Sequence, residues 1–405
     1  MENRTTREEP LLFLTGIYPD EWREAFCDPS YNANIQIAAD VLQRHLIRGF
    51  EENLGHPIPL LNAPYIGVFP RTCKLARMKA FDFSHTDGAK DRNIGFWNIP
   101  VWRHIAIYRQ SRKGIRDYVR ENPNGVVMAY TLNLRNMYRL RYAKKKAPSI
   151  RTCLVAPDLP LFMNVSASLP YRVMKTWEDK RIRKRLRWVD SYVMLTEQMN
   201  EYLGADRYCV VEGIAAEREW TAKVPSTEKT VLYTGTLEEK YGVLRLVEAF
   251  SRIDDPDARL CICGKGECEN ALKEAEKNDP RIRYLGQVPH ERVLELQREA
   301  AVTVNPRPAG ETFTKYSFPS KNLEYLVSGV PLVACKLAGI PSEYDPYICY
   351  AQDDTVDALK EAIESILRLT PQEREQRGRA AFEFVTTQKN PKMQTKRILD
   401  MLKRE

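Results

Sequence analysis

The chain has 405 residues, of which 43% are hydrophobic and 29% charged, with a formal net charge of +8. This composition is typical of a soluble globular protein, and the length fits two domains of about 200 residues. No stretch approaches the roughly 20 consecutive apolar residues of a membrane-spanning helix. The first residues, MENR, begin no signal-peptide core. We therefore expect a cytoplasmic protein with an acidic partner, whether nucleotide sugar, nucleic acid or anionic membrane surface.

In the first half of the chain, apolar strands alternate with helical patterns. We expect strands at 11–17, 66–69, 126–130, 153–156 and 191–196, and helices at 34–54, 101–121 and 134–146. Such alternation is typical of a parallel sheet covered on both faces. The periodicity lapses between 212 and 229, and we place a domain boundary near 205–225.

The second half repeats the same alternation. We expect strands at 231–235, 259–263, 282–285, 301–305, 330–334 and 347–350, and helices at 242–253, 267–277, 289–299, 319–328, 355–368, 372–388 and 391–404. The predicted fold class is therefore α/β.

The segment from 301 to 334 is the most informative, because it reads as strand, irregular loop, helix and strand. Pro319 suits the first turn of the helix and Gly329 its end. Ligands of parallel sheets bind outside the carboxyl ends of the strands. A helix N-terminus at that edge suits a phosphate, and Lys321 adds a charge in the first turn. Glu324 lies on the same helix face, where its carboxylate is placed for ribose hydroxyls, so we predict a nucleotide site.

This segment, NPRPAGETFTKYSFPSKNLEYLVSGVPLVA, resembles the donor-site region of the family 4 glycosyltransferases, which have the GT-B fold. Glu324 matches the second Glu of the family's Glu-x7-Glu pattern, and Gly329 and Pro331 match the run that follows it. Tyr316 stands where the first Glu is expected. The form FPSK-x-x-EY resembles the branch that builds bacterial capsular polysaccharides and exopolysaccharides.

Further segments carry the same resemblance through the second half: YTGTLEEKYGVLRLVEAF, CGKGE and YLGQV. In the first half, only VAPDLP and VMLTEQM are similar to the polysaccharide branch. The resemblance implies two doubly wound Rossmann-like domains facing a cleft. Residues 1–210 would form the acceptor-binding domain and 211–388 the donor-binding domain, and a helix within 389–405 would cross back to the first domain.

Sugar transfer leaves negative charge on the departing nucleoside diphosphate, so cations near it are the largest expected contribution to catalysis. Lys240 is the leading candidate. The family pairs this Lys with an Arg where the present chain has Thr236, and we expect Lys321, or else Lys315 or Arg307, to replace it. The predicted catalytic residues are Lys240, Glu324 and Lys321, and the predicted donor-binding residues are Gly235, Thr236, Gly264, Gly266, Tyr316, Phe318 and Ser320. The alternative is that the lysines and Glu324 are solvated helix residues.

We expect no Asp-x-Asp motif that holds a divalent cation, because the acidic run that begins at Asp254 and Asp255 reads as a helix-end turn. The resemblance implies a retaining, metal-independent reaction without a cofactor. The donor would be a UDP- or GDP-linked sugar. Cys261, Cys263 and Cys268 could be proposed as a metal site, but no histidine lies near them in sequence, and we favour buried structural thiols.

The acceptor side offers weaker signals. His85 lies in a polar loop that could face the cleft or solvent, and Asp158 could contact an acceptor hydroxyl or belong to a turn. Residues 171–188 are rich in Lys and Arg and carry one apolar face. They read as a basic amphipathic helix that lies on an anionic membrane or is simply solvated.

Three functions remain in view. The first is a glycosyltransferase, peripheral on the inner leaflet, that moves a sugar to a lipid-linked saccharide in surface polysaccharide synthesis. The second is a sugar phosphorylase or epimerase of related fold. The third is a non-catalytic nucleotide-sugar-binding protein, suggested by Tyr316 and Thr236. A nucleic-acid binder is disfavoured, because the basic residues form no recognisable module.

Overall fold

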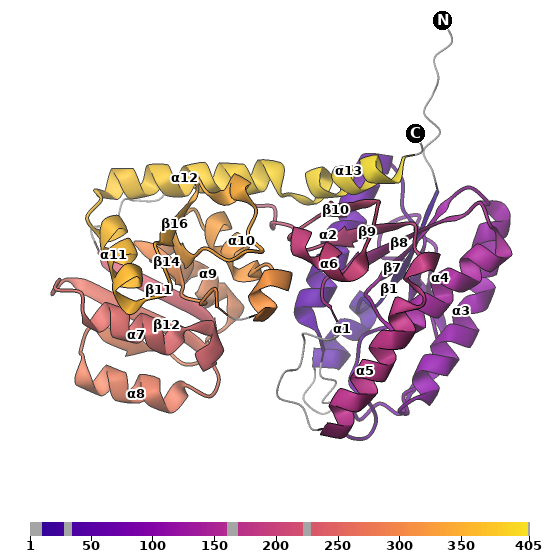
Figure 1. Cartoon of the computed structure of the whole chain (residues 1–405), viewed down its shortest axis with the longest axis horizontal. Coiled ribbons are helices and arrows are strands. Elements are labelled where there is room, and N and C mark those ends of the chain that lie inside the picture. The colour runs from indigo at the N-terminus through magenta and orange to yellow at the C-terminus, as the bar shows by residue number, and fades with distance from the viewer. Residues whose placement is uncertain (1–9, 28–34, 160–168, 222–227, 311, 404–405) are drawn as a thin grey trace, which may run out of the picture. The chain divides into compact units, whose positions relative to one another are not determined.

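A computed structural model describes residues 10–27, 35–159, 169–221, 228–310 and 312–403. The chain divides into two compact units: unit 1 comprises Met1–Val211 and Pro391–Glu405, and unit 2 comprises Glu212–Asn390. Each unit is an α/β layer structure built on one large sheet (Figure 1). The predicted fold class is thus confirmed.

The sheet of unit 1 contains, within the described residues, eight strands in the order β10-β9-β8-β7-β1-β2-β5-β4. Neighbouring strands are parallel except β4 and β5, which are antiparallel. A separate antiparallel pair joins β3 and β6. The strands are β1 Leu11–Thr15, β2 Leu60–Asn62, β3 Arg77–Met78, β4 Phe81–Phe83, β5 Asp91–Asn93, β6 Phe96–Trp97, β7 Val126–Tyr130, β8 Arg151–Ala156, β9 Ser191–Met194 and β10 Tyr208–Val210.

The helices of unit 1 cover this sheet, and every residue of β7 and β8 is buried, as strands covered on both faces require. Helix α13 packs on α2, where Asn53 Nδ2 donates to the carbonyl of Lys392 (2.8 Å) and to Thr395 Oγ1 (2.9 Å). The helices are α1 Asp20–Cys27, α2 Ile37–Leu54, α3 Trp102–Glu121, α4 Leu134–Lys146, α5 Leu169–Arg183, α6 Asn200–Leu203 and α13 Pro391–Leu402, with 3-10 turns η1 Leu186–Trp188 and η2 Glu197–Met199.

Unit 2 has a wholly parallel sheet, with its described strands in the order β13-β12-β11-β14-β15-β16. The strands are β11 Lys229–Thr236, β12 Ala258–Lys265, β13 Ile282–Tyr284, β14 Val302–Asn305, β15 Leu332–Cys335 and β16 Ile348–Ala351. The helices are α7 Val243–Ser251, α8 Glu269–Asn278, α9 His290–Glu299, α10 Ser320–Val327, α11 Val356–Leu367 and α12 Pro371–Gln388, with 3-10 turns η3 Glu239–Tyr241, η4 Thr312–Tyr316 and η5 Ser342–Tyr344.

The predicted strand at 66–69 is wrong, since the second strand of unit 1 is β2 and residues 63–68 form neither strand nor helix. Side chains take the place of a strand partner here. Asn98 Nδ2 donates to the carbonyl of Gly67 (2.9 Å), and the backbone N–H of Val68 donates to Thr72 Oγ1 (2.8 Å). The backbone groups are satisfied locally, so the apolar run needs no ladder.

Strand order reverses between β1 and β7 in unit 1 and between β11 and β14 in unit 2. In a doubly wound sheet, the carboxyl ends of the strands at such a point are where ligands bind. Both reversal points carry the polar groups described below.

Candidate functional site

A pocket of about 580 Å³ lies at the carboxyl ends of β11, β12 and β14, at the reversal point of unit 2. Three strand ends and the first turn of α10 line it, including Gly235, Thr236, Gly264, Lys265, Asn305, Arg307, Phe318, Ser320 and Lys321. Six of these were predicted: Gly235, Thr236, Gly264, Phe318, Ser320 and Lys321.

Helix α10 is held so that its first turn faces this pocket. The hydroxyl of Tyr325 accepts a hydrogen bond from the backbone N–H of Thr234 (2.8 Å) and donates to the carbonyl of Thr234 (3.1 Å). Asn305 Nδ2 donates to Asn322 Oδ1 (2.6 Å). These buried contacts join α10 to the ends of β11 and β14, so its first turn, with Ser320 and Lys321, faces the pocket.

The wall formed by β11 and β12 consists largely of main chain. Gly264 has φ +147°, and a Cβ there would lie 1.8 Å from the carbonyl oxygen of Gly235. A Cβ on Gly266 would lie 2.4 Å from the carbonyl oxygen of Leu237. Both positions therefore require glycine for the close approach of the two backbones.

The pocket is strongly cationic. Lys265, Arg307 and Lys321 line it, and the described lining residues include no Asp or Glu. The Arg307 guanidinium donates to Ser317 Oγ (3.0 Å) and lies beside Tyr241, with Cζ 5.5 Å from the ring centre. Burial lowers the pKa of Arg307. Three basic side chains beside a helix N-terminus suit a ligand with more than one negative charge.

Glu324 lies one turn along α10 from the pocket, on the same face as Lys321. Its carboxylate oxygens are 2.9 and 3.0 Å from Lys321 Nζ, and Gln297 Nε2 donates to it (2.5 Å). Burial opposes the charged form, but Lys321 and Gln297 outweigh it and lower the pKa of Glu324. The carboxylate is thus ionised and partly exposed, next to the lining but outside it.

Three other predicted donor-site residues also lie outside the described lining: Lys240, Gly266 and Tyr316. The Lys240 ammonium is half-exposed and forms an ion pair with Glu238, which raises its pKa despite some burial. Tyr316 is half-buried, and Lys315 Nζ lies 5.5 Å from its ring centre. The roles of these residues remain predictions.

His85 is not a solvent-exposed loop side chain, because only 9% of it is accessible. Its Nδ1 lies 2.6 Å from the carboxylate of Asp91 and its Nε2 lies 2.7 Å from that of Glu51. Burial alone would lower its pKa, but the two carboxylates raise it to about 9. Both ring nitrogens are occupied, so the geometry favours a structural clamp over contact with an acceptor.

Asp158 follows the carboxyl end of β8, as expected of a turn residue there. Asp158 is an exposed residue, and partial desolvation of its carboxyl by the surrounding protein raises its pKa.

The basic segment 171–188 spans most of α5 and continues through the turn η1, so it is not one continuous helix. Ile182 is fully buried, whereas 56% of Trp177 is exposed, with the Arg181 guanidinium carbon 4.2 Å from its ring centre. Arg181 and Arg185 both donate to the hydroxyl of Tyr138 (3.0 and 2.9 Å). Part of the positive charge therefore fastens the segment to α4.

Sequence reasoning missed Lys265, Asn305 and His290 as lining residues and ranked Arg307 too low. The first two are the last residues of β12 and β14. Reading the final residue of each predicted parallel strand as a candidate would have found Asn305, whereas Lys265 lies two residues beyond the predicted end of its strand.

The cysteines that the structure describes are free thiols, and burial raises the pKa of Cys261, Cys263 and Cys268. Within the described ranges, no group of three or more His, Cys, Asp or Glu side chains is placed to hold a metal ion. No described helix has the length and hydropathy to cross a membrane.

Comparison with known proteins gives this geometry a context. Residues 228–368 match the family of group 1 glycosyl transferases. The phosphatidyl-myo-inositol mannosyltransferase of Mycobacterium leprae is 28% identical over 209 residues, which are 50% of this chain and 52% of that protein. The matched part therefore spans about half the length of this curated relative.

Solved structures agree along nearly the whole chain. The sucrose-phosphate synthase of Thermosynechococcus elongatus has a TM-score of 0.63 at 15% identity, covering 97% of this chain and 98% of that one. An E. coli structure described as trehalose-6-phosphate bound with UDP-2-fluoro glucose has a TM-score of 0.61 at 10% identity, covering 98% and 99%. At such identities the likeness shows the fold, which is the GT-B type.

Proposed function

We propose that this protein is a glycosyltransferase that moves a sugar from a nucleoside-diphosphate sugar to a saccharide acceptor. The observation that carries the proposal is the pocket of unit 2, where Lys265, Arg307 and Lys321 surround a helix N-terminus and no described lining residue is acidic. That pocket falls within the segment that matches the group 1 glycosyl transferases. Its cations suit the diphosphate of a donor in the ground state and the charge that develops on it as the sugar departs.

In this proposal, the diphosphate lies at the first turn of α10 and contacts Lys321 and Arg307. Glu324, held ionised by Lys321 and Gln297, accepts hydrogen bonds from the ribose hydroxyls. Lys240 reaches the departing phosphate after leaving Glu238, which its exposed position permits. We propose a UDP- or GDP-linked donor and a retaining reaction without a metal ion.

We further propose a lipid-linked acceptor, approached from the cytoplasm at the inner leaflet during surface polysaccharide synthesis. Exposed apolar side chains of unit 1 support membrane contact: Trp97, Trp102, Met174 and Trp177. Lys175 follows Met174 on α5. Its charge also lowers the pKa of His104 on α3, after the larger effects of burial, Arg135 and Arg103. Aromatic side chains beside basic ones suit the interface of an anionic membrane.

Nucleotide binding is tested first, by titrating UDP, GDP and their sugar conjugates while following the unfolding temperature. A ligand that binds only the folded chain raises that temperature. Lys321→Ala should weaken binding about 10- to 100-fold, because a charged hydrogen bond contributes about 1.5–3 kcal/mol. Lys277→Ala, at an ion-paired and exposed position of α8, is the matched control and should bind like the wild type. Equal affinity of all three proteins would refute the site.

Transfer is tested with the donor that binds. Glu324→Ala and Lys240→Ala should abolish transfer while the protein stays folded, and full activity in either would remove that residue from the mechanism. Co-sedimentation with vesicles tests the membrane contact. Phosphatidylglycerol vesicles should bind the chain, phosphatidylcholine vesicles should not, and Trp102→Ser with Trp177→Ser should release it. Retention of that double variant on the vesicles would contradict this part of the proposal.

A further inference from the structure

Three arginines of unit 1 gather at the carboxyl ends of β1, β2 and β7, the reversal point of that sheet. Arg135 and Arg139 come from α4 and Arg103 from α3. Only 8% of Arg135 and 1% of Arg139 are exposed. Among the described residues, none of the three forms an ion pair with a carboxylate, and in each the Nε is buried without a hydrogen-bond partner.

Two of these arginines have evident structural roles. Arg139 donates to Asn136 Oδ1 (3.2 Å) and to the carbonyl of Leu61 (3.4 Å). Arg103 donates to the carbonyl of Ile66 (3.0 Å) and to Asn98 Oδ1 (3.3 Å). These side chains tie α4 and α3 to the ends of neighbouring segments.

Arg135 differs, because its guanidinium lies against the ring of Tyr65, with Cζ 5.7 Å from the ring centre. It is the second residue of α4, so it adds positive charge where the helix N-terminus is already positive. It also stands four residues before Arg139 on the same helix, a spacing at which like charges repel.

The three charges act on one another. Burial, and then the charge of Arg135, lower the pKa of Arg103 to about 10 and that of Arg139 to about 9. The hydroxyl of Tyr65 is a hydrogen-bond partner of Arg135, but it is neutral. A buried cation without an anionic partner is costly, and an anion seated among the three would offset that cost.

Gly16 and Tyr65 pack closely beside Arg135. Gly16 follows β1, and a Cβ there would lie 2.1 Å from the Tyr65 ring, so glycine leaves the space that the ring fills. Tyr65 in turn donates to the carbonyl of Tyr130 at the end of β7. The backbone N–H of Gly16 donates to Gln43 Oε1 (2.8 Å).

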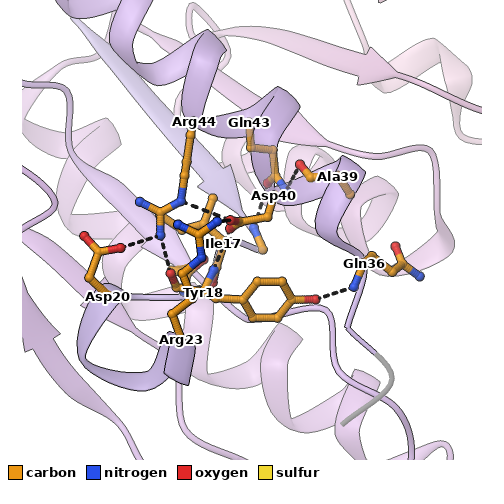
Figure 2. Close-up of polar contacts among 11 residues, drawn as sticks. Ile17, Tyr18, Asp20, Arg23, Gln36, Ala39, Asp40, Gln43 and Arg44 are labelled. Carbon is orange, nitrogen blue, oxygen red and sulfur yellow. Dashed lines mark hydrogen bonds and ion pairs between the residues drawn. The ribbon is translucent and has the colours of Figure 1, made fainter. Parts of the chain in front are cut away.

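Helix α2 fixes the rest of the loop that follows β1 (Figure 2). The backbone N–H of Tyr18 donates to Asp40 Oδ1 (2.9 Å), while Arg44 Nε donates to Asp40 Oδ2 (3.0 Å). Arg44 also pairs with Asp20 (2.9 Å). The carboxylates of Asp20 on α1 and Asp40 on α2 therefore pair with Arg44 and the backbone, not with the three arginines.

We propose that Arg135, with Arg103 and Arg139 behind it, binds a phosphate group carried by the acceptor. The planar guanidinium matches two phosphate oxygens at once. The inference rests on the proposed function in taking unit 1 as the acceptor side. The phosphate belongs either to a soluble sugar phosphate or to the diphosphate of a lipid-linked saccharide, and both offer the same oxygens.

Stability without ligand is the first test. Substituting a structural arginine should lower the unfolding temperature, whereas substituting a ligand-binding arginine should leave it unchanged or raise it. Arg135→Gln removes a repelled cation and should leave the unfolding temperature unchanged or raise it, by about 2–4 °C for each kcal/mol gained. Arg139→Gln, the matched control, removes hydrogen bonds to Asn136 and Leu61 and should lower it. A loss in Arg135→Gln as large as that in Arg139→Gln would overturn the proposal.

Binding is the second test, measured by calorimetry with UDP saturating unit 2, at constant ionic strength in chloride. Methyl phosphate and dimethylallyl diphosphate should bind the wild type, and Arg135→Gln should weaken binding about tenfold or more. The affinity of Arg135→Lys should lie between those of the wild type and Arg135→Gln, since lysine keeps the charge but cannot donate two parallel hydrogen bonds to the phosphate. Tighter binding of the diphosphate indicates the lipid-linked source, and equal or tighter binding of the monoester indicates the soluble one.

Affinities that do not depend on residue 135, for both phosphates, would overturn the proposal. Failure of UDP to bind would instead count against the proposed function of unit 2. The two failures are distinguishable because the Arg135 dependence is then measured without nucleotide.

Discussion

Tyr325→Phe tests the contact that holds α10 against the sheet of unit 2. The ladder between β11 and β14 ends at Leu232 and Thr303. Two residues further on, the Tyr325 hydroxyl takes the place of the missing strand, pairing with both the N–H and the carbonyl of Thr234. The phenol is fully buried, so no water is at hand to replace its oxygen.

The substitution deletes one oxygen and leaves the N–H of Thr234 without a partner. A buried polar group left unsatisfied costs about 1–3 kcal/mol. Taking about 2 kcal/mol, the unfolding transition of a unit of this size should shift down by about 4–8 °C. UDP affinity should also fall, because the first turn of α10 loses its anchor.

Both effects are measured by urea denaturation and by nucleotide titration. Tyr284→Phe is the matched control, since its hydroxyl donates to the carbonyl of Gly264 (3.1 Å) from a half-buried position that water reaches. It should cost well under half as much. Equal stability of Tyr325→Phe and the wild type would refute the reasoning that this hydroxyl substitutes for a strand.

Three further changes test other parts of the molecule. The raised pKa of His85, about 9, means that protonated His85 stabilises the folded protein fully below about pH 6.5 and that this stabilisation is lost as pH rises through about 9. The free energy of unfolding should therefore fall by up to about 3 kcal/mol over that range. His85→Gln should remove this pH dependence. Gly264→Ala should cost about 3 kcal/mol or more in a denaturant titration, because its Cβ overlaps a backbone oxygen. Lys389→Met should cost about 3–5 kcal/mol by the same method, because it leaves the carboxylate of Glu212, 2.6 Å away and fully buried, without its cation.

The last two of these have a contrasting variant. Gly286→Ala meets no atom within 4 Å and carries only the strain of φ +68°, about 1–2 kcal/mol. Adding Glu212→Gln to Lys389→Met should restore much of the lost stability, because no buried charge then remains. Additive losses in that double variant, or a pH profile unchanged by His85→Gln, would contradict the corresponding argument.

Local features of the site were readable from the sequence. The alternation of buried strands and helices predicts two parallel sheets, because burial on both faces leaves apolar runs such as those of β7 and β15. Pro319 and Gly329 bracket α10. Pro319 is the N-cap, one residue before the predicted first-turn position, and each residue suits its helix end for reasons confined to its own backbone. Six of the predicted donor-binding and catalytic residues line the pocket for a similarly local reason: they end a strand, or they begin or directly precede α10.

What the tertiary structure decided is which distant groups meet. The sequence suggests a solvent-exposed loop residue at His85, but the carboxylate of Glu51 on α2 lies beside its second ring nitrogen. Lys240, the leading candidate from the sequence, forms an ion pair with Glu238, whereas Arg307, a less favoured candidate, lines the pocket. The apolar run at 66–69 forms no strand, because Asn98 and Thr72 satisfy its backbone. Periodicity records how deeply a residue is buried. It contains no information on strand order or on partners far along the chain. These are decided only by how the elements pack within each unit.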